Sequence, residues 1–429
     1  MTRLIFALSG NPQRTIADTV LRGQMRRMAG SGILVAVGYI DPGNWATDIA
    51  GGSGFGYGLL SIVLLSAILA MGFQVLAARV AVATGRDLAQ LTAAELSRPF
   101  ARLAWLAGEA AILATALAEL IGGAIALRLL FGLPLMAGVA ITGVGTFLVF
   151  YLTRGQTERH ERVIAVLLAI VALSFVFLLL EARPSWLAMG TGITQTGRAL
   201  SHTEGFMIAL GILGATLMPH NLYLHSGTLA ERARQLPPHA RPLAYTVARN
   251  DTIVSLGIAM LINAAIMIVA AASMSGSGPA IASLDGAHAA IGQSLGAAAA
   301  IVFAVALYAA GQSSTITGVM AGRMLSAGFN PGRGLSDPGR AAVTRVVAAV
   351  AAMLLLGLSS GQDPDQWLVL SQVVLSLALP FALVPLVLLA CRRSVMGERV
   401  LHPAWATAAV AATAGIIVLD LYLVADALI

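Results

Sequence analysis

Two four-residue motifs put chemically active side chains inside apolar stretches of the chain. One is DPGN at residues 41–44, and the other is MPHN at residues 218–221. Each motif combines a proline, which breaks a helix, with side chains that bind cations or protons. An ionisable residue in the middle of a membrane costs about 2.5–3.5 kcal/mol on insertion scales, so it marks a functional position by default. Paired helix breaks at matching places in two halves of a chain are typical of a transporter's substrate site.

The two motifs supply donor atoms for a metal ion. Asp41 offers a carboxylate and Asn44 an amide oxygen, whereas Met218 offers a softer thioether. The carbonyl groups of Gly38 and Ala215, one turn before each break, add further oxygens. A mixed oxygen and sulfur set suits a divalent transition metal better than Ca²⁺ or Mg²⁺, which favour oxygen alone. We therefore expect a transported metal ion here and no resident cofactor.

Each feature also has a simpler interpretation. A Pro-Gly kink in a membrane helix often serves packing alone, and Asp41 also fits an internal salt bridge. Met218 by itself is typical of a core filler, and His220 by itself of a satisfied hydrogen-bonding group. The joint arrangement favours a site, because chance does not readily produce both motifs in equivalent spans.

The composition identifies a membrane protein. Of 429 residues 58% are hydrophobic and only 11% charged, with a mean hydropathy of +0.85, which no soluble domain of this size has. The sequence contains no lysine, and its arginines fall between apolar segments, so the net charge of +6 does not suggest nucleic acid. Cys391 is the only cysteine, which excludes an internal disulfide and a cysteine-based metal cluster.

The hydropathy pattern predicts an all-α polytopic protein with eleven transmembrane helices. The arginines orient it: 23 of 26 fall on one side of these segments, and the other three are Arg128, Arg183 and Arg198. The positive-inside rule then puts the N-terminus in the cytoplasm and the C-terminus outside. The predicted segments are 30–56 (broken), 58–83, 103–128, 133–153, 162–181, 204–229 (broken), 251–274, 294–322, 342–360, 366–391 and 403–427.

The broken segments are the first and the sixth. An odd number of spans per repeat forces the second repeat to insert upside down, so five plus five helices form an inverted repeat. The predicted organisation is a cytoplasmic segment 1–29, a first repeat 30–181, a second repeat 204–391, and an additional helix 403–427.

These motifs carry a family resemblance. YIDPGNWATDI, GATLMPHNLYLHS, ATGRDLAQL, AGQSSTITGVMAGR and LSQVVLSLALPFALVPL resemble segments of the Nramp family of divalent-metal transporters, of the bacterial manganese-transporter type. The similarity runs over essentially the whole chain. It implies a LeuT-type inverted-repeat fold with helices 1 and 6 unwound at mid-membrane. It also implies metal ligands at Asp41, Asn44, Met218, the Ala215 carbonyl and, in some states, Gly38, with Gln372 approaching the ion when the site is occluded.

The resemblance further implies proton coupling. Glu119 is a buried ionisable residue in the third span, and His220 has an unperturbed pKa of about 6.5. In the family the aspartate of the first helix, a glutamate of the third and this histidine handle protons. Glu109 matches a second acidic position, although a charge near the helix end is an equally good interpretation.

The ninth span contributes two further candidates, Arg340 and Arg345. The chain departs from the family in two places: Ala116 stands where an acid is common, and Ala341 where a second arginine is often seen. These departures put the proton route, and hence the tightness of coupling, in question.

The predicted function is a secondary transporter, not an enzyme, in the bacterial inner membrane. It would import Mn²⁺ and Fe²⁺, and also Cd²⁺, by proton symport and alternating access. One alternative is a metal facilitator with weak or absent coupling. Another is an organic-solute transporter of the same fold, against which the fixed charge of Asp41 argues. An intramembrane metalloenzyme would need a motif such as HExxH, which the sequence lacks.

Overall fold

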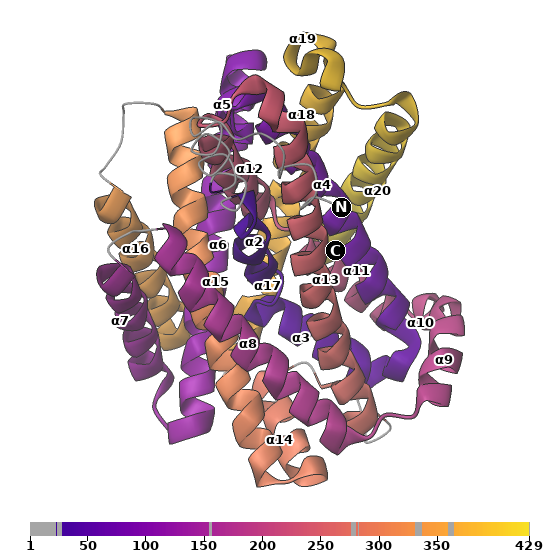
Figure 1. Ribbon diagram of the computed structural model, residues 1–429. Helices are drawn as coiled ribbons and strands as arrows, with labels where there is room; N and C mark the ends of the chain where they lie inside the picture. Colours follow the sequence, from indigo (N-terminus) through magenta and orange to yellow (C-terminus); the bar gives the residue numbers. More distant parts are fainter. Residues whose placement is uncertain are drawn as a thin grey trace, which may run out of the picture.

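The computed structural model describes residues 23, 28–153, 157–275, 280, 281, 283–330, 337–358 and 364–428. Every regular element among these residues is a helix, so the predicted all-α architecture is confirmed. Figure 1 shows a bundle in which α2 and α3 lie at the centre, surrounded by longer helices. Most of the predicted N-terminal segment 1–29 lies outside the described residues.

The long helices are α4 (Leu60–Thr84), α6 (Arg98–Phe131), α7 (Leu135–Thr153), α8 (Thr157–Ala182), α13 (Arg241–Met274), α15 (Ala297–Phe329), α16 (Asp337–Leu358) and α20 (Pro403–Leu428). Three pairs of shorter helices are α2 (Ser31–Gly38) with α3 (Pro42–Phe55), α11 (Thr203–Thr216) with α12 (Pro219–Ala233), and α17 (Asp365–Ala378) with α18 (Pro380–Cys391). The connections hold η1 (Gly56–Leu59), α5 (Leu88–Glu95), α9 (Trp186–Thr194), α10 (Thr196–Ser201), η2 (Pro238–Ala240), α14 (Leu284–Leu295), α19 (Arg393–Met396) and η3 (Gly397–Arg399).

Eight helical segments of the described chain are long and apolar enough to cross a membrane, and two further apolar helices are shorter. Each of the eleven predicted segments coincides with a helix or a pair of helices, but eleven membrane crossings stay a prediction. The eight are Pro42–Thr84, Arg98–Phe131, Arg159–Ala182, Thr203–Ala233, Pro238–Met274, Ala297–Phe329, Asp365–Cys391 and Pro403–Tyr422, and the shorter two are Leu135–Val149 and Val343–Leu358.

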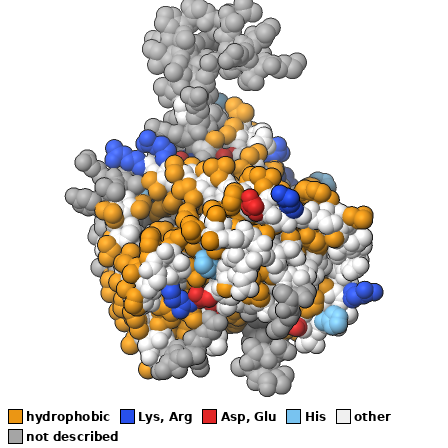
Figure 2. Space-filling model, turned by 90° about the horizontal axis from the view of Figure 1, so that it is seen from below, with side chains coloured by type: hydrophobic (Ala, Val, Ile, Leu, Met, Phe, Trp, Pro, Cys, Tyr) orange, Lys and Arg blue, Asp and Glu red, His pale blue; other side chains and the backbone are white. Residues whose placement is uncertain are grey.

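The outer surface is apolar. On α8, for example, Leu173, Val176 and Leu180 are each more than half exposed. Figure 2, which views the molecule from the lower end of Figure 1, shows mostly hydrophobic and uncharged side chains with scattered charges. The exposed leucine and valine side chains on α8 suit contact with lipid rather than water.

The two predicted helix breaks are present. Residues 39–41 separate α2 from α3, and residues 217–218 separate α11 from α12. In each case a proline is the first residue of the second half-helix, where its missing N–H and fixed φ are tolerated.

The tenth predicted span, 366–391, coincides with one candidate membrane span, Asp365–Cys391, which is interrupted at a single residue whose backbone angles stay helical. Leu379 separates α17 from α18, and Pro380 opens the second half-helix. Pro385, in contrast, lies inside α18 without ending it. Proline alone therefore does not decide where a membrane helix breaks, because neighbouring groups can satisfy the carbonyl that it leaves free.

The first half-helix is held at its start by a neighbouring helix. Asp251 of α13 accepts hydrogen bonds from the backbone N–H groups of Gly30 (3.0 Å) and Gly32 (2.7 Å) at the same carboxylate oxygen. A β-carbon on Gly32 would lie only 2.7 Å from the backbone oxygen of Asp251, so this close approach requires glycine. The contact fixes where α2 begins, and hence where its far end meets α3.

Candidate metal-binding site

The first break presents Asp41 at the start of α3. Its side chain caps the half-helix, because Oδ1 accepts hydrogen bonds from the backbone N–H of Asn44 (3.0 Å) and from Asn44 Nδ2 (2.8 Å). The other carboxylate oxygen, Oδ2, is buried and has no hydrogen-bond partner among the described residues. Asp41 is thus oriented through one oxygen and leaves the other free.

The second break presents Met218 in the equivalent position. Met218 is the residue that precedes α12, and it is only 1% exposed. Its Sδ atom accepts a hydrogen bond from Asn221 Nδ2 at 3.5 Å. Small residues of α6 and α17, among them Ala111 and Ala378, pack around it. The sulfur therefore lies in a close-packed interior and not at the surface.

Each proline frees a carbonyl group one turn earlier. In a continuous helix the carbonyl of Gly38 would accept from the N–H of residue 42, and that of Ala215 from residue 219. In this chain residues 42 and 219 are both proline, which has no N–H to donate. The carbonyl groups of Gly38 and Ala215 therefore lack this helical hydrogen bond. The C-terminal ends of α2 and α11 also carry partial negative charge, which favours a cation.

The two breaks face each other. Thr216, the last residue of α11, donates a hydrogen bond to Asn44 Oδ1 at 3.5 Å. The Asn221 side chain lies on Gly38, because a β-carbon there would be 2.7 Å from Oδ1 and 2.9 Å from Cγ. Gly38, Asn44 and Met218, predicted from separate halves of the sequence, thus belong to one cluster of contacts.

Gln372 of α17 joins the same cluster. Its amide lies directly against Gly43, where an added β-carbon would overlap it, and that β-carbon would also lie 3.2 Å from Asp41 Oδ2. Gln372 Nε2 donates to Ser371 Oγ (3.2 Å), while Oε1 has no partner among the described residues.

Three buried oxygen acceptors in this cluster lack a hydrogen bond within the described part of the chain: Asp41 Oδ2, Asn221 Oδ1 and Gln372 Oε1. Buried polar atoms are normally paired, so a group of unpaired acceptors calls for a partner. A cation is such a partner for Asp41 Oδ2, the one charged acceptor of the three. The described residues contain no group of three or more His, Cys, Asp or Glu side chains able to hold a metal, so the donors here are one carboxylate, amides, carbonyls and a thioether.

The predicted proton-handling residues lie beside this cluster. Glu119 of α6 accepts a hydrogen bond at Oε2 from Arg345 Nη2 (2.8 Å), and the same nitrogen donates to the Thr315 carbonyl (2.6 Å). His220 Nδ1 lies 3.4 Å from the Thr115 hydroxyl, one turn of α6 before Glu119. Glu119 and His220 therefore approach the same stretch of α6.

Glu109 lies apart from this group. It is half-buried, its Oε1 accepts from Trp105 Nε1 (2.9 Å), and it is ten residues, or about 15 Å along the helix, from Glu119. The side chain of Arg340 lies outside the described residues. Residue 116, one turn of α6 before Glu119, is a buried alanine, so no second acid lies beside Glu119 at this position.

The sequence analysis missed His225, which belongs to a polar chain on the other side of the first break; interhelical hydrogen bonding was the expected role of Gln74 and Asn263. Tyr39 OH accepts from Gln74 Nε2 (2.9 Å), and Gln74 Oε1 lies 2.9 Å from Nδ1 of His225. His225 Nε2 in turn lies 3.3 Å from the Thr252 hydroxyl, and Asn263 donates to the Tyr39 carbonyl (2.8 Å). The sequence signal for this chain of contacts is the presence of polar residues in otherwise apolar spans.

Asp48 was also missed. It is 2% exposed, it lies seven residues after Asp41 on the same face of α3, and its Oδ2 has no partner among the described residues. That spacing in an apolar span would have pointed to it.

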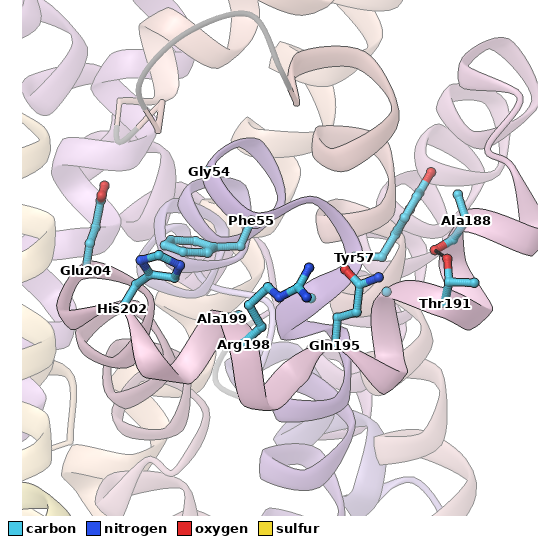
Figure 3. A pocket seen from close by; sticks show the side chains of 12 residues that line it. Gly54, Phe55, Tyr57, Ala188, Thr191, Gln195, Arg198, Ala199, His202 and Glu204 are labelled. Atoms are coloured by element: carbon cyan, nitrogen blue, oxygen red, sulfur yellow. Dashed lines mark hydrogen bonds between the residues drawn. The ribbon is translucent and has the colours of Figure 1, made fainter.

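A surface pocket of about 510 Å³ contains none of the predicted site residues. It lies where the end of α3 and η1 meet α9, α10 and α11, and Figure 3 shows Phe55 and His202 side by side at one end, with Arg198 and Gln195 between them and Tyr57. The Phe55 and His202 rings are 6.3 Å apart.

Comparisons with known proteins identify the family of this chain. The model of the family described as natural resistance-associated macrophage protein-like, or Nramp, matches residues 32–426. The chain belongs to the Nramp family. This Nramp chain is 47% identical over 400 residues to the "Divalent metal cation transporter MntH" of Brucella suis, which covers 92% of this chain and 87% of the relative.

The solved structures support the fold of this Nramp protein. A crystal structure of a mutant of the Eremococcus coleocola manganese transporter is similar with a TM-score of 0.84 at 33% identity, over 92% of this chain and 86% of that one. Mhp1, a nucleobase-cation-symport-1 family transporter, shares the fold alone, with a TM-score of 0.56 at 19% identity over 92% and 88% of the two chains. The predicted LeuT-type architecture is confirmed, and the Nramp chain is a multi-pass bacterial membrane protein.

Proposed function

We propose that this Nramp chain is a secondary transporter that imports divalent transition-metal ions, Mn²⁺ and Fe²⁺ and also Cd²⁺, across the bacterial inner membrane. The observation that carries the proposal is the position of Asp41 and Met218 at two helix breaks that contact each other through Thr216 with Asn44 and Asn221 with Gly38, with unpaired acceptors around them. The names of the relatives, a divalent metal cation transporter and a manganese transporter, support the same substrate class.

The metal ion would bind between the half-helices. Asp41 Oδ2 supplies the only full negative charge among the proposed ligands, and Asn44 Oδ1, the Ala215 carbonyl and, in some states, the Gly38 carbonyl supply neutral oxygens. The Met218 thioether adds a soft donor, which Mg²⁺ and Ca²⁺ use poorly. Gln372 is proposed to approach the ion as the site closes, since its amide already lies against Gly43.

Release of the ion to either side requires the two halves to rock around these breaks. The repeat boundaries 30–181 and 204–391, with 403–427 appended, are part of the proposal. So is an orientation with the N-terminus in the cytoplasm and the C-terminus outside. The arginine distribution supports that orientation, because cytoplasmic loops are enriched in positive charge.

Proton symport is the finer part of the proposal. Asp41, His220 and Glu119 would carry the proton, with Arg345 as the partner of Glu119 and with Glu109 and Arg340 nearer the exit. The short path from His220 through Thr115 to Glu119 along α6 supports this order.

An uncoupled facilitator is the second candidate. Ala116 favours it, because the buried position one turn from Glu119 has no acid.

The test is uptake of Mn²⁺ into proteoliposomes that contain a pH-sensitive dye. Metal entry with matching, metal-dependent acidification is the expected result and would establish symport. Metal entry without acidification would retain the metal site and refute proton coupling. Absence of metal uptake in the intact protein, at any imposed pH gradient, would refute the metal-transport proposal itself.

A further inference from the structure

The two half-helices begin with the same local design. In each, the residue before the helix is a proposed ligand, the first residue is proline, and the third is asparagine. In α3 the Asn44 amide nitrogen donates to Asp41 Oδ1 at 2.8 Å. In α12 the Asn221 amide nitrogen donates to Met218 Sδ at 3.5 Å. In both halves, therefore, the asparagine at the third position of the helix holds the donor side chain of the residue that precedes the helix.

Asn221 itself has little freedom. It is fully buried, and its side chain lies on the backbone of Gly38 in the opposing half-helix. Its side-chain atoms lie close to where a β-carbon on Gly38 would stand, so packing confines the amide to this place, and the hydrogen bond from Nδ2 to Met218 Sδ sets which end faces the sulfur. Its Oδ1 atom has no hydrogen-bond partner among the described residues, so no competing contact turns the amide away from Met218.

Met218, in contrast, is intrinsically adaptable. A methionine side chain has three rotatable bonds and a soft sulfur, and it usually fills whatever space is offered. The residues of its apolar cluster, Ala111, Ala114, Leu375 and Ala378, have no polar side-chain atom and give it no directional contact. The bond from Asn221 is the contact that selects one sulfur position, and it engages one side of the sulfur while leaving a lone pair free.

We propose that Asn221 is a positioning residue that holds the Met218 sulfur toward the transported ion and thereby sets the preference for soft metals. The inference rests on the proposed metal-transport function. Loss of the Asn221 N–H should let the thioether move away from the ion. The binding of a soft ion such as Cd²⁺ should then weaken more than the binding of Mn²⁺, which depends mainly on oxygen donors.

The test measures Cd²⁺ and Mn²⁺ binding by calorimetry on the purified full-length protein. Asn221→Ala should raise the Kd for Cd²⁺ about tenfold and that for Mn²⁺ less than about twofold, as expected for loss of one oriented donor. In a Met218→Ala background the same substitution should leave the Cd²⁺ affinity unchanged, because the sulfur is already absent. Gln312→Ala removes a buried amide that bonds to the Thr142 carbonyl and Tyr308, and is the matched control.

A spectroscopic readout separates positioning from a general structural effect. X-ray absorption at the cadmium edge should show a sulfur neighbour in the wild type and a weaker one in Asn221→Ala. Equal losses for both metals, an unchanged sulfur signal, or an equal further loss in the Met218→Ala background would each overturn the proposal. If the alanine variant does not fold, Asn221→Leu retains the volume and removes the same donor. Failure of the wild type to bind either metal would instead refute the proposed function.

Discussion

Arg345 of α16 and Glu119 of α6 form an ion pair of 2.8 Å in the interior of the bundle, with exposures of only 2% and 0%. The pair joins two helices whose sequences are more than two hundred residues apart. Arg345 also donates to the Thr315 carbonyl, so α15 belongs to the same contact. Of the two arginines predicted for this network, Arg345 therefore has a defined partner.

Removing one member of this pair should strongly destabilise the protein. Glu119→Ala leaves an uncompensated guanidinium inside the bundle, and we expect a loss of about 3–5 kcal/mol in the free energy of unfolding. Glu95→Ala breaks the exposed Arg86–Glu95 pair and should change the free energy of unfolding by about 1 kcal/mol or less. Denaturant titration of the detergent-solubilised protein measures both. Replacing both Glu119 and Arg345 with leucine should recover most of the stability; equal losses for Glu119→Ala and Glu95→Ala would contradict a structural role for the buried pair.

Asp41 is the residue on which transport depends most. Asp41→Ala removes the only carboxylate among the proposed ligands, and we expect Mn²⁺ uptake into proteoliposomes to fall at least about a hundredfold, equivalent to roughly 2.7 kcal/mol. Asp285→Ala is the control, since Asp285 pairs with Arg128 away from the site. Retained uptake in Asp41→Ala would show that the ion binds elsewhere.

Met218 should control which metals enter. In Met218→Ala only oxygen donors remain, so we expect Cd²⁺ transport to fall by about tenfold or more while Mg²⁺ or Ca²⁺ begins to compete with Mn²⁺. Uptake of Mn²⁺ in the presence of excess Mg²⁺ measures the change. Met324→Ala, on α15, is a matched control for loss of a buried methionine. A selectivity identical to the wild type would mean that the sulfur is not a ligand.

Gly43 and Gln372 should act as one unit. A methyl group on residue 43 would occupy the position of the Gln372 amide, so Gly43→Ala displaces that amide without altering any donor atom. We expect Gly43→Ala and Gln372→Ala to weaken Mn²⁺ uptake by similar factors, and the double variant to be no worse than either single one. Additive losses would show that Gln372 does not act through its contact with Gly43. Gly72→Ala, where no atom lies within 4 Å of the added carbon, controls for helix propensity.

The sequence predicted the breaks and the main donors because the helix-breaking effect of proline and the metal affinity of a carboxylate or thioether depend on the residue type alone. It did not predict the break at Leu379, since Pro380 and Pro385 are equivalent in sequence and only the surroundings distinguish them. The choice of arginine was also open. Arg340 and Arg345 are five residues apart, which turns their side chains about 140° from each other, and only packing decides which faces α6.

Contacts between halves were the least predictable. The link from Gln74 to His225 joins residues 151 positions apart, and no local pattern reports that α4 and α12 are neighbours. The same holds for Asn221 on Gly38: each residue belongs to a recognisable motif, but their contact depends on how the two halves meet.

The prolines at the two breaks have a genetic consequence. Two proposed ligands are main-chain oxygens, so replacing Gly38 or Ala215 leaves the donor atom in place, and an effect of substitution at Gly38 would report the clash with Asn221 and not the loss of a ligand. A substitution four residues later can instead occupy the carbonyl oxygen with a hydrogen bond. Pro219→Ala would restore an N–H able to bond to the Ala215 carbonyl, and Pro42→Ala would do the same for Gly38. Variation at two residues that never touch the ion could therefore retune which ions this lineage accepts.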